Sequence, residues 1–519
     1  MLRQIKSSAV SFKPSAFKDL FLSFLSAVLL ILSFPGFNIE FLAWFAFVPL
    51  FFAIQNKSKI KAFFLSYFAG IIFWFGIIYW LVHVTLPGMI ILVLYLAIYF
   101  GVFGLLFSFY TLYAIRYTLL VIPAFWVLLE YIRSHLFTGF PWALLGYSQY
   151  LNLSVIQIAD ITGVWGVSYL VMMVNVAIYS VIGYWLSVIG KGEKCLFAIL
   201  VLIATLAYGY YKLYRVPSTL PDRQAGEYRV PLKISVIQGN IAQELKWNPI
   251  SRDYIINKYL NLTQRIIKDK PDLIIWPEAA LPVVLEEEPV FFDKVKAFVK
   301  ETKVPLLLGA VTTRDGQYYN SAILISKKGE PLTQYDKLHL VPFGEYIPFK
   351  KTLRFLENLV PIGDFTFGKE YTVLQVRSSE YRVPSKLSVL ICFEDLFPQI
   401  SREFTKRGAD FLVNITNDAW FKITSSPYQH LQASVFRAVE NRITLIRAAN
   451  TGVSGFIAPS GKIISLVQNR SGQNLFIDGY ATQEIIIAKK KFSFYTKYGD
   501  TFILFCFIFG IFGVIRLVR

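Results

Sequence analysis

The stretch Lys386–Asp395 reads K-L-S-V-L-I-C-F-E-D and joins a buried strand to reactive side chains. Its first residues alternate and then become continuously apolar, which is the pattern of a core strand. The strand runs directly into Cys392, and the acids Glu394 and Asp395 follow. A rigid sheet holds such a backbone while the side chain faces the loops, so the stretch predicts a nucleophile. A small buried thiol without chemistry is the alternative that this stretch alone leaves open.

The composition indicates a membrane protein with a water-soluble part. The chain has 519 residues, of which 55% are hydrophobic and 17% aromatic, more than a soluble protein of this size carries. Its cysteines, Cys195, Cys392 and Cys506, form neither a disulfide framework nor a metal-ligand pattern, so we expect no metal and no cofactor. The net charge of +18 comes without a nucleic-acid motif. We assign it to loops beside apolar segments and to anionic lipid headgroups, and expect no nucleic-acid partner.

A series of apolar segments predicts a helical membrane bundle. The segments are Leu20–Phe34, Ile39–Ile54, Ala62–Val82, Met89–Ala114, Leu119–Tyr131, Val164–Val188, Cys195–Leu213 and Thr501–Val518. Most of them reach the length of about 20 residues that a bilayer core requires, and the others are short. We therefore expect a polytopic α-helical bundle of about eight spans. About seven of these helices fall in residues 1–213, and the last lies in residues 499–519, which end in a basic tail.

The basic residues predict the orientation of this bundle. They gather in alternate connectors, at Lys57–Lys61, Arg116 and Lys191–Lys194, and in the tail at Arg516 and Arg519. The positive-inside rule then places both termini in the cytoplasm and residues 214–498 outside it. The connector Tyr131–Gly163 on that outer side is rich in aromatic residues, including Trp142 and Tyr147, so we expect an interfacial belt or a lipid-binding rim there.

Residues 214–498 predict a layered α/β domain. Strand-like runs such as Ile234–Ile237 and Phe411–Ile415 alternate with helical stretches such as Asp253–Lys268 and His430–Arg442. This alternation is typical of sheets covered by helices. We expect linkers between the domain and the membrane at Pro217–Arg223 and Lys489–Lys491.

Two further stretches supply groups that suit a reactive cysteine. The run I-I-W-P-E-A ends an apolar strand at Glu278, and the segment Tyr335–Pro348 supplies Lys337, His339 and Glu345. A cysteine with an ordinary pKa of about 8.5 needs a base or a cation to react at neutral pH. Glu278 suits the base. Lys337 and the backbone N–H of Phe393 suit an oxyanion, while His339 is the alternative base of a Cys/His pair. From these residues alone, Cys/Glu/Lys and Cys/His remain competing interpretations.

The order Glu278, Lys337, Cys392 resembles the catalytic trio of the nitrilase superfamily. The motifs W-P-E, K-x-H-L-V-P-F-G-E, C-x-E and N-D-A-W-F behind several membrane spans resemble the bacterial apolipoprotein N-acyltransferases over nearly the whole chain. The resemblance implies an α-β-β-α sandwich with Glu278 as general base, Lys337 as oxyanion stabiliser and Cys392 as nucleophile. The supporting or substrate-binding residues would be Glu345, Glu394, Phe393, Trp247, Trp420 and His339. Phe393 and Lys422 depart from the family pattern, which has tyrosine and glycine there.

The resemblance also implies a reaction and a location. Cys392 would take an acyl chain from a phospholipid as a thioester and pass it to the α-amino group of diacylglyceryl-cysteine on an apolipoprotein. The protein would be a monomer in the bacterial inner membrane, with residues 214–498 in the periplasm. Two rival functions are a membrane-tethered nitrilase or amidase-type carbon–nitrogen hydrolase and a transporter with a solute-binding domain. The spans hold few charged residues, which disfavours the transporter.

Overall fold

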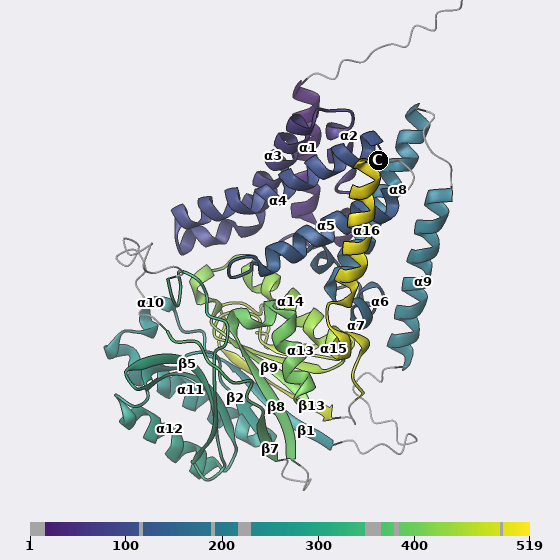
Figure 1. Ribbon diagram of the computed structural model, residues 1–519. Helices are drawn as coiled ribbons and strands as arrows, with labels where there is room; N and C mark the ends of the chain where they lie inside the picture. Colours follow the sequence, from purple (N-terminus) through teal and green to yellow (C-terminus); the bar gives the residue numbers. More distant parts are fainter. Residues whose placement is uncertain are drawn as a thin grey trace, which may run out of the picture.

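The computed structural model describes residues 16–113, 118–187, 193–215, 230–347, 365–377, 384–487 and 491–518. In these residues a helical bundle is stacked on an α/β sandwich (Figure 1). The expected linker Pro217–Arg223 and most of Lys489–Lys491 lie outside the described residues.

Each apolar segment of the sequence is mostly helical over its described residues. The long helices are α1 (Ala16–Leu32), α3 (Lys59–Ile78), α4 (Leu86–Tyr113), α5 (Thr118–His135), α8 (Val164–Ser187), α9 (Glu193–Arg215) and α16 (Thr501–Val518), and the short ones include η1 (Glu40–Trp44), α2 (Val48–Ile54), α6 (Leu153–Ile156) and α7 (Ala159–Thr162). Within the described ranges, four helical stretches are long and apolar enough to cross a membrane: Lys59–His83, Leu86–Phe109, Val164–Gly183 and Leu196–Tyr214. A membrane part is therefore supported, and the count of about eight spans stays a prediction.

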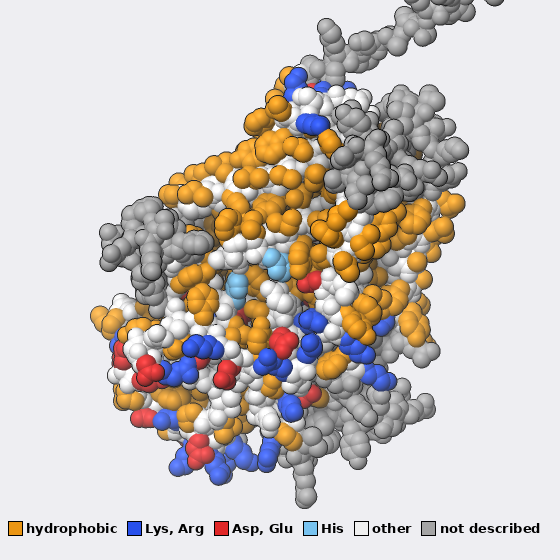
Figure 2. All heavy atoms as spheres, in the orientation of Figure 1, with side chains coloured by type: hydrophobic (Ala, Val, Ile, Leu, Met, Phe, Trp, Pro, Cys, Tyr) orange, Lys and Arg blue, Asp and Glu red, His pale blue; other side chains and the backbone are white. Residues whose placement is uncertain are grey.

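The surface changes character between the bundle and the sandwich. Figure 2 shows hydrophobic side chains over the helical part, and lysine, arginine and acidic side chains gathered over the sandwich. Large apolar side chains on the bundle helices point outward, such as Phe64, Ile91 and Leu200, which are exposed by 62%, 68% and 55%. Apolar surface of this extent is expected where lipid replaces water as the solvent.

Two sheets face each other in the sandwich. One has the order β13-β1-β2-β4-β5-β6 with β3 beside β4, and the other has the order β12-β11-β10-β9-β8-β7. The strands are β1 (Val230–Gln238), β2 (Leu273–Ile275), β3 (Leu281–Val284), β4 (Leu306–Arg314), β5 (Gln317–Ile325), β6 (Pro331–Asp336), β7 (Leu374–Arg377), β8 (Pro384–Ile391), β9 (Phe411–Thr416), β10 (Thr444–Ala449), β11 (Gly455–Ile457), β12 (Ile463–Leu466) and β13 (Gly479–Ile487). Parallel pairing of β8 with β9 and of β9 with β10 makes the second sheet's centre, where the predicted core strand lies.

Helices cover the outer face of each sheet. The helices α11 (Arg252–Ile266) and α12 (Pro289–Thr302) pack on the first sheet, and α13 (Pro398–Lys406) and α14 (Ser426–Asn441) pack on the second (Figure 1). The layers are therefore α-β-β-α, as the resemblance implies. The strand and helix stretches quoted from the sequence are confirmed, whereas short strands such as β3, β7 and β12 carry too little pattern to be predicted.

The helix α14 joins the sandwich to the bundle and is buried along nearly its whole length. The side-chain oxygen of Gln429 accepts hydrogen bonds from the indole N–H groups of Trp80, at 3.0 Å, and Trp142, at 2.7 Å. At the other end of the helix, Glu440 accepts a hydrogen bond from the backbone N–H of Val164, at 2.9 Å. These contacts correct one expectation. The side chains of Trp142 and Tyr147 are only 3% and 1% exposed, so they form the seat of α14 rather than an interfacial belt.

Candidate active site

Cys392 lies where β8 ends and the 3-10 helix η8 (Cys392–Leu396) begins. Its φ angle is +53°, a left-handed conformation that costs a residue with a Cβ about 1–2 kcal/mol. Its carbonyl oxygen accepts hydrogen bonds from Asn414 Nδ2, at 3.0 Å, and from the His430 ring, at 3.2 Å. Such strain persists where surrounding contacts impose it, and it concentrates at functional sites.

The thiol of Cys392 is electrostatically coupled to both predicted partners. Burial and the charge of Glu278 raise the pKa of the Cys392 thiol above its ordinary value, and the charge of Lys337 acts in the opposite direction. The thiol is therefore protonated at neutral pH before substrate arrives. Chemistry at its sulfur requires a base that removes this proton as the bond forms.

Lys337 lies among carboxylates at the end of β6. Its Nζ lies 2.8 Å from Glu345 Oε2 and 3.7 Å from Glu278 Oε1. Burial alone would lower the pKa of Lys337, but Glu345 and Glu278 raise it above the ordinary value, so the ammonium stays charged. Asn320 Nδ2 donates to Glu278 Oε1 and to Glu345 Oε1, both at 2.8 Å, and so bridges the two acids. The structure thus brings Glu278, Lys337 and Glu345 together, with Cys392 close enough for electrostatic coupling to Glu278 and Lys337.

Glu394 connects the segment after β6 to the strand that ends at Cys392. Its carboxylate accepts hydrogen bonds from the Tyr335 hydroxyl at 2.8 Å, and from the backbone N–H groups of Leu338 at 2.7 Å and Ile391 at 2.7 Å. Burial raises the pKa of Glu394 to about 7, and these hydrogen bonds counteract that effect. All of these donors are backbone N–H groups or the tyrosine hydroxyl. This geometry suits a residue that fixes the positions of two segments rather than one that transfers a proton.

The side chain of His339, in the segment that Glu394 fixes, packs against aromatic rings. Its ring centroid lies 3.8 Å from that of Phe397 and 6.1 Å from that of Phe393. Burial, with a smaller effect from Lys337, lowers the pKa of His339 to about 4. The ring of His339 thus packs against aromatic side chains, while Cys392 is electrostatically coupled to Glu278 and Lys337, which favours the Cys/Glu/Lys interpretation over Cys/His.

The remaining predicted residues lie at the edges of the site. Trp247 follows the short helix α10 (Gln243–Lys246) and is 44% exposed, as a residue that meets a substrate would be. Trp420 lies in η9 (Asp418–Phe421) and is half-buried. The next residue, Lys422, has a φ angle of +52°, the region that favours the glycine usual in the family.

Three buried polar residues of the site were missed from the sequence. Lys246 is 1% exposed and its Nζ donates to the backbone oxygen of Glu278 at 2.9 Å. Burial lowers the pKa of Lys246 to about 8, against the opposing charges of Glu278 and Cys392. Asn320 and His430 are the other two. Of the three, only Asn320 left a signal, because it directly precedes the strand-like run Ser321–Ile325.

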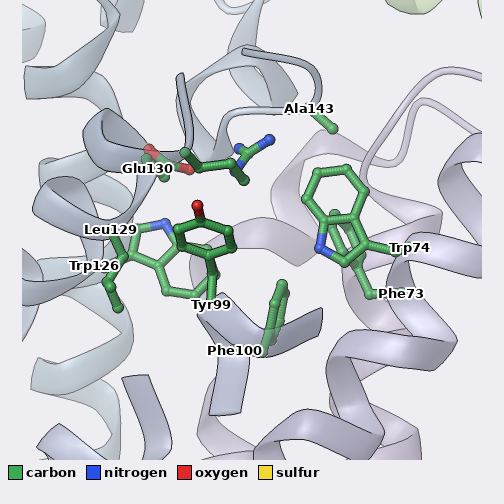
Figure 3. Close-up of a pocket in the computed structure, with 9 residues that line it drawn as sticks. Phe73, Trp74, Tyr99, Phe100, Trp126, Leu129, Glu130 and Ala143 are labelled. Carbon is green, nitrogen blue, oxygen red and sulfur yellow. The ribbon is translucent and has the colours of Figure 1, made fainter. Parts of the chain in front are cut away.

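A cavity in the bundle lies between α3, α4 and α5 (Figure 3). Its lining includes Trp74, Tyr99, Trp126 and Glu130, which Figure 3 shows grouped around it. Arg133 also lines the cavity and donates to the backbone oxygen of Trp142 at 2.8 Å. Arg133 in the cavity wall therefore fixes the loop with Trp142, on which α14 packs.

Comparisons with known proteins cover both parts of the chain. Residues 26–177 match the family model of the apolipoprotein N-acyltransferase N-terminal domain, and residues 233–479 match that of carbon-nitrogen hydrolase. An apolipoprotein N-acyltransferase of Geobacter metallireducens is 39% identical, over 94% of this chain and 93% of its own length. That of Chlorobaculum tepidum is 30% identical, over 96% of both chains.

Among solved structures, a mutant of the Nesterenkonia AN1 amidase from the nitrilase superfamily is 20% identical. It covers 52% of this chain and 93% of its own, with a TM-score of 0.38. The family assignment rests on the sequence relatives, whose similarity runs through bundle and sandwich alike. The chain therefore belongs to the apolipoprotein N-acyltransferase family.

Proposed function

We propose that this protein moves an acyl chain from a phospholipid, through a thioester on Cys392, to the α-amino group of a diacylglyceryl-cysteine apolipoprotein. One observation carries the proposal: a single chain combines the group Cys392, Glu278 and Lys337 with an apolar helical bundle. The relatives of this chain are named apolipoprotein N-acyltransferases. A site seated on membrane helices reaches ester bonds at headgroup depth while acyl chains stay in hydrocarbon.

In the first half-reaction, Glu278 takes the proton of the Cys392 thiol as the sulfur attacks the acyl ester carbonyl. The carbonyl oxygen becomes an oxyanion, which the Lys337 ammonium and the backbone N–H of Phe393 stabilise. The intermediate then collapses, the carbon–oxygen ester bond breaks, and the leaving glycerol oxygen receives the proton from Glu278. The products are a lysophospholipid and an acyl thioester on Cys392.

In the second half-reaction, the neutral α-amino group of the acceptor attacks the thioester carbonyl. The same donors stabilise the oxyanion, and Glu278 takes a proton from the attacking nitrogen. The carbon–sulfur bond breaks as an amide forms, and Glu278 returns the proton to the Cys392 sulfur. Glu345 and Glu394 serve as positioning residues, because their contacts fix the Lys337 ammonium and the two loops.

The proposed location is the bacterial inner membrane, with the sandwich in the periplasm. Two features support this topology. The helix α1 begins and α16 ends at the end of the bundle farthest from the sandwich, as Figure 1 shows. Lys57 lies between α2 and α3, and Lys59 and Lys61 lie in the first turn of α3. They lie at that same end (Figure 1), because Lys57 pairs with Asp19 in the first turn of α1, and the positive-inside rule expects the cytoplasm there.

The test is mass spectrometry of the purified protein after incubation with phospholipid alone. We expect an acyl adduct on the peptide that contains Cys392, released by neutral hydroxylamine and missing in Cys392→Ala. Addition of a peptide that begins with diacylglyceryl-cysteine should then discharge the adduct and yield the N-acyl peptide. Discharge to free fatty acid alone would favour the carbon–nitrogen hydrolase alternative, and an adduct on serine would refute the mechanism.

A further inference from the structure

A network of charged side chains lies directly behind Cys392. It comprises Asp395 in η8, Asp418 in η9, His430 in α14 and Arg447 in β10, and none is more than 3% exposed. His430 Nε2 lies 2.7 Å from Asp395 Oδ1, and His430 Nδ1 lies 3.2 Å from Asp418 Oδ1. Arg447 Nη1 lies 2.9 Å from Asp395 Oδ2. The proposed reaction gives these four residues no role.

The ring of His430 is charged in this setting. Burial alone would lower the pKa of His430, and Arg447 acts the same way, but Asp395 and Asp418 raise it to about 9. Both ring nitrogens are therefore donors at neutral pH. Nε2 divides its hydrogen between Asp395 Oδ1 and the backbone oxygen of Cys392, the latter at 3.2 Å.

This contact with the Cys392 oxygen bears on the oxyanion donor. The oxygen of Cys392 and the N–H of Phe393 belong to one planar trans peptide unit, so they point in opposite directions. Whatever fixes the oxygen also fixes the direction of the N–H. The peptide follows a residue with a strained φ of +53°, so its orientation depends on donors such as His430 and Asn414.

The position of His430 is set from the membrane bundle. The preceding residue, Gln429, accepts from Trp80 and Trp142 and donates to the backbone oxygen of Ile77 at 3.1 Å. These bonds fix the first turns of α14, and the His430 ring lies 5.9 Å from that of Trp142. The bundle therefore determines how far the imidazolium reaches toward Cys392.

We propose that His430 is a positioning residue that aims the Phe393 N–H at the oxyanion, by holding the Cys392 carbonyl from behind. The inference rests on the proposed function, in which that N–H is the second oxyanion donor. The neighbours of His430 define its partners: the Asp395 carboxylate anchors the ring, and Asn414 Nδ2 is the companion donor on the same carbonyl. Hydrogen bonding to the carbonyl also polarises the peptide and strengthens its N–H as a donor.

Two substitutions of His430 distinguish the contributions of its two ring nitrogens. His430→Gln places an amide nitrogen near the position of Nε2, whereas His430→Asn reaches only the position of Nδ1. We measure two reactions of Cys392 in full-length protein: the p-nitrophenol burst from p-nitrophenyl butyrate, and alkylation by iodoacetamide, read from the Cys392 peptide. Acylation passes through an oxyanion, and alkylation does not.

His430→Asn should slow the acylation burst by about 10²-fold, in line with loss of an oxyanion donor, while alkylation stays within about threefold of wild type. His430→Gln should retain acylation within about tenfold of wild type. The matched control is Gln432→Asn, two residues further along α14, whose side chain donates to the backbone oxygen of Tyr147 at 2.9 Å. Its two rates should equal those of wild type.

The proposal is overturned if His430→Asn acylates at the wild-type rate, if it loses both reactions equally, or if His430→Gln is as slow as His430→Asn. Should His430→Asn be recovered unfolded, Asn414→Leu carries the test, because it removes the other donor to the Cys392 oxygen. The butyrate ester keeps this test separate from the lipid substrate. A wild-type protein that forms the butyryl adduct but none from phospholipid contradicts the proposed function and leaves the role of His430 measurable.

Discussion

The ammonium of Lys337 lies closer to Glu345 than to Glu278. Its distances are 2.8 Å and 3.0 Å to the two carboxylate oxygens of Glu345, and 3.7 Å to Glu278 Oε1. Glu345 thus supplies the counter-charge that a buried ammonium needs. In the proposed mechanism Glu278 is then left to accept a proton, with Asn320 Nδ2 as its direct hydrogen-bond donor.

Glu345→Gln is therefore expected to reduce both stability and rate. Loss of one partner from a buried ion pair costs about 3–5 kcal/mol of folding free energy, and Lys337 is 1% exposed. With Glu345 neutral, the ammonium turns to Glu278 and makes it a weaker base, so thioester formation should slow by about 10²-fold. Thermal unfolding and adduct time courses measure the two effects.

The control for Glu345→Gln is Glu403→Gln. Glu403 pairs with Arg407 at 2.8 Å on the protein surface, and such pairs contribute about 0–1 kcal/mol. Its stability and adduct rate should match wild type. A wild-type adduct rate in Glu345→Gln would show that Glu345 does not serve Lys337.

Substitutions of Glu278, Lys337 and His339 distinguish the Cys/Glu/Lys interpretation of the site from the Cys/His interpretation. Glu278→Gln should slow thioester formation by about 10²–10⁴-fold and Lys337→Met by about 10²–10³-fold. His339→Gln should cost far less, because the His339 ring packs on Phe397. Loss of the adduct in His339→Gln together with its survival in Glu278→Gln would establish the Cys/His pair instead.

Lys246 predicts a pH dependence of stability. Burial lowers the pKa of Lys246 to about 8, below the value of about 10.4 in an unfolded chain. Between these values the unfolded state binds more protons than the folded state, so the stability of the folded protein rises with pH in this window. Thermal unfolding of wild type relative to Lys246→Met should show a gain from pH 8 to about pH 10.4.

Lys246→Arg is the companion variant, since its charge does not titrate in that range. The gain should be missing in a comparison of Lys246→Arg with Lys246→Met. A difference between wild type and Lys246→Met that stays constant with pH would mean that Lys246 keeps an ordinary pKa. Acyl-adduct rates of the same variants report whether its contact with the Glu278 backbone matters for the reaction.

The sequence was informative where chemistry follows directly on a strand. Glu278 and Cys392 end apolar runs, and Lys337 lies in a dense motif, so the pattern made them candidates, and the family resemblance then gave them their expected roles. Lys246 and His430 could not be found this way, because a lysine in a short helix and a histidine in an amphipathic one usually face solvent. Their burial is a tertiary effect that depends on where α10 and α14 pack.

The prediction of an interfacial belt in the connector Tyr131–Gly163 was wrong for the same reason. Trp142 and Tyr147 are aromatic residues of the kind found in an interfacial belt, but α14 buries them. This helix is almost 300 residues away in the chain: Gln429 follows Trp142 by 287 residues, and Gln432 follows Tyr147 by 285. Apolar length, in contrast, is a local property, and it identified the bundle helices correctly. Which of those helices cross the bilayer depends on lipid as well as on sequence.

The topology is tested with introduced cysteines in a background that lacks the three natural ones. Lys327 is exposed in the turn between β5 and β6, and Lys61 is exposed in the first turn of α3 at the opposite end of the molecule. If the positive-inside rule holds for this bundle, Lys327→Cys reacts with a membrane-impermeant maleimide in intact spheroplasts, and Lys61→Cys reacts only after lysis. The reverse labelling would place the sandwich in the cytoplasm. It would then be separated from lipoproteins outside the membrane, and the proposed acyl acceptor would have to be abandoned.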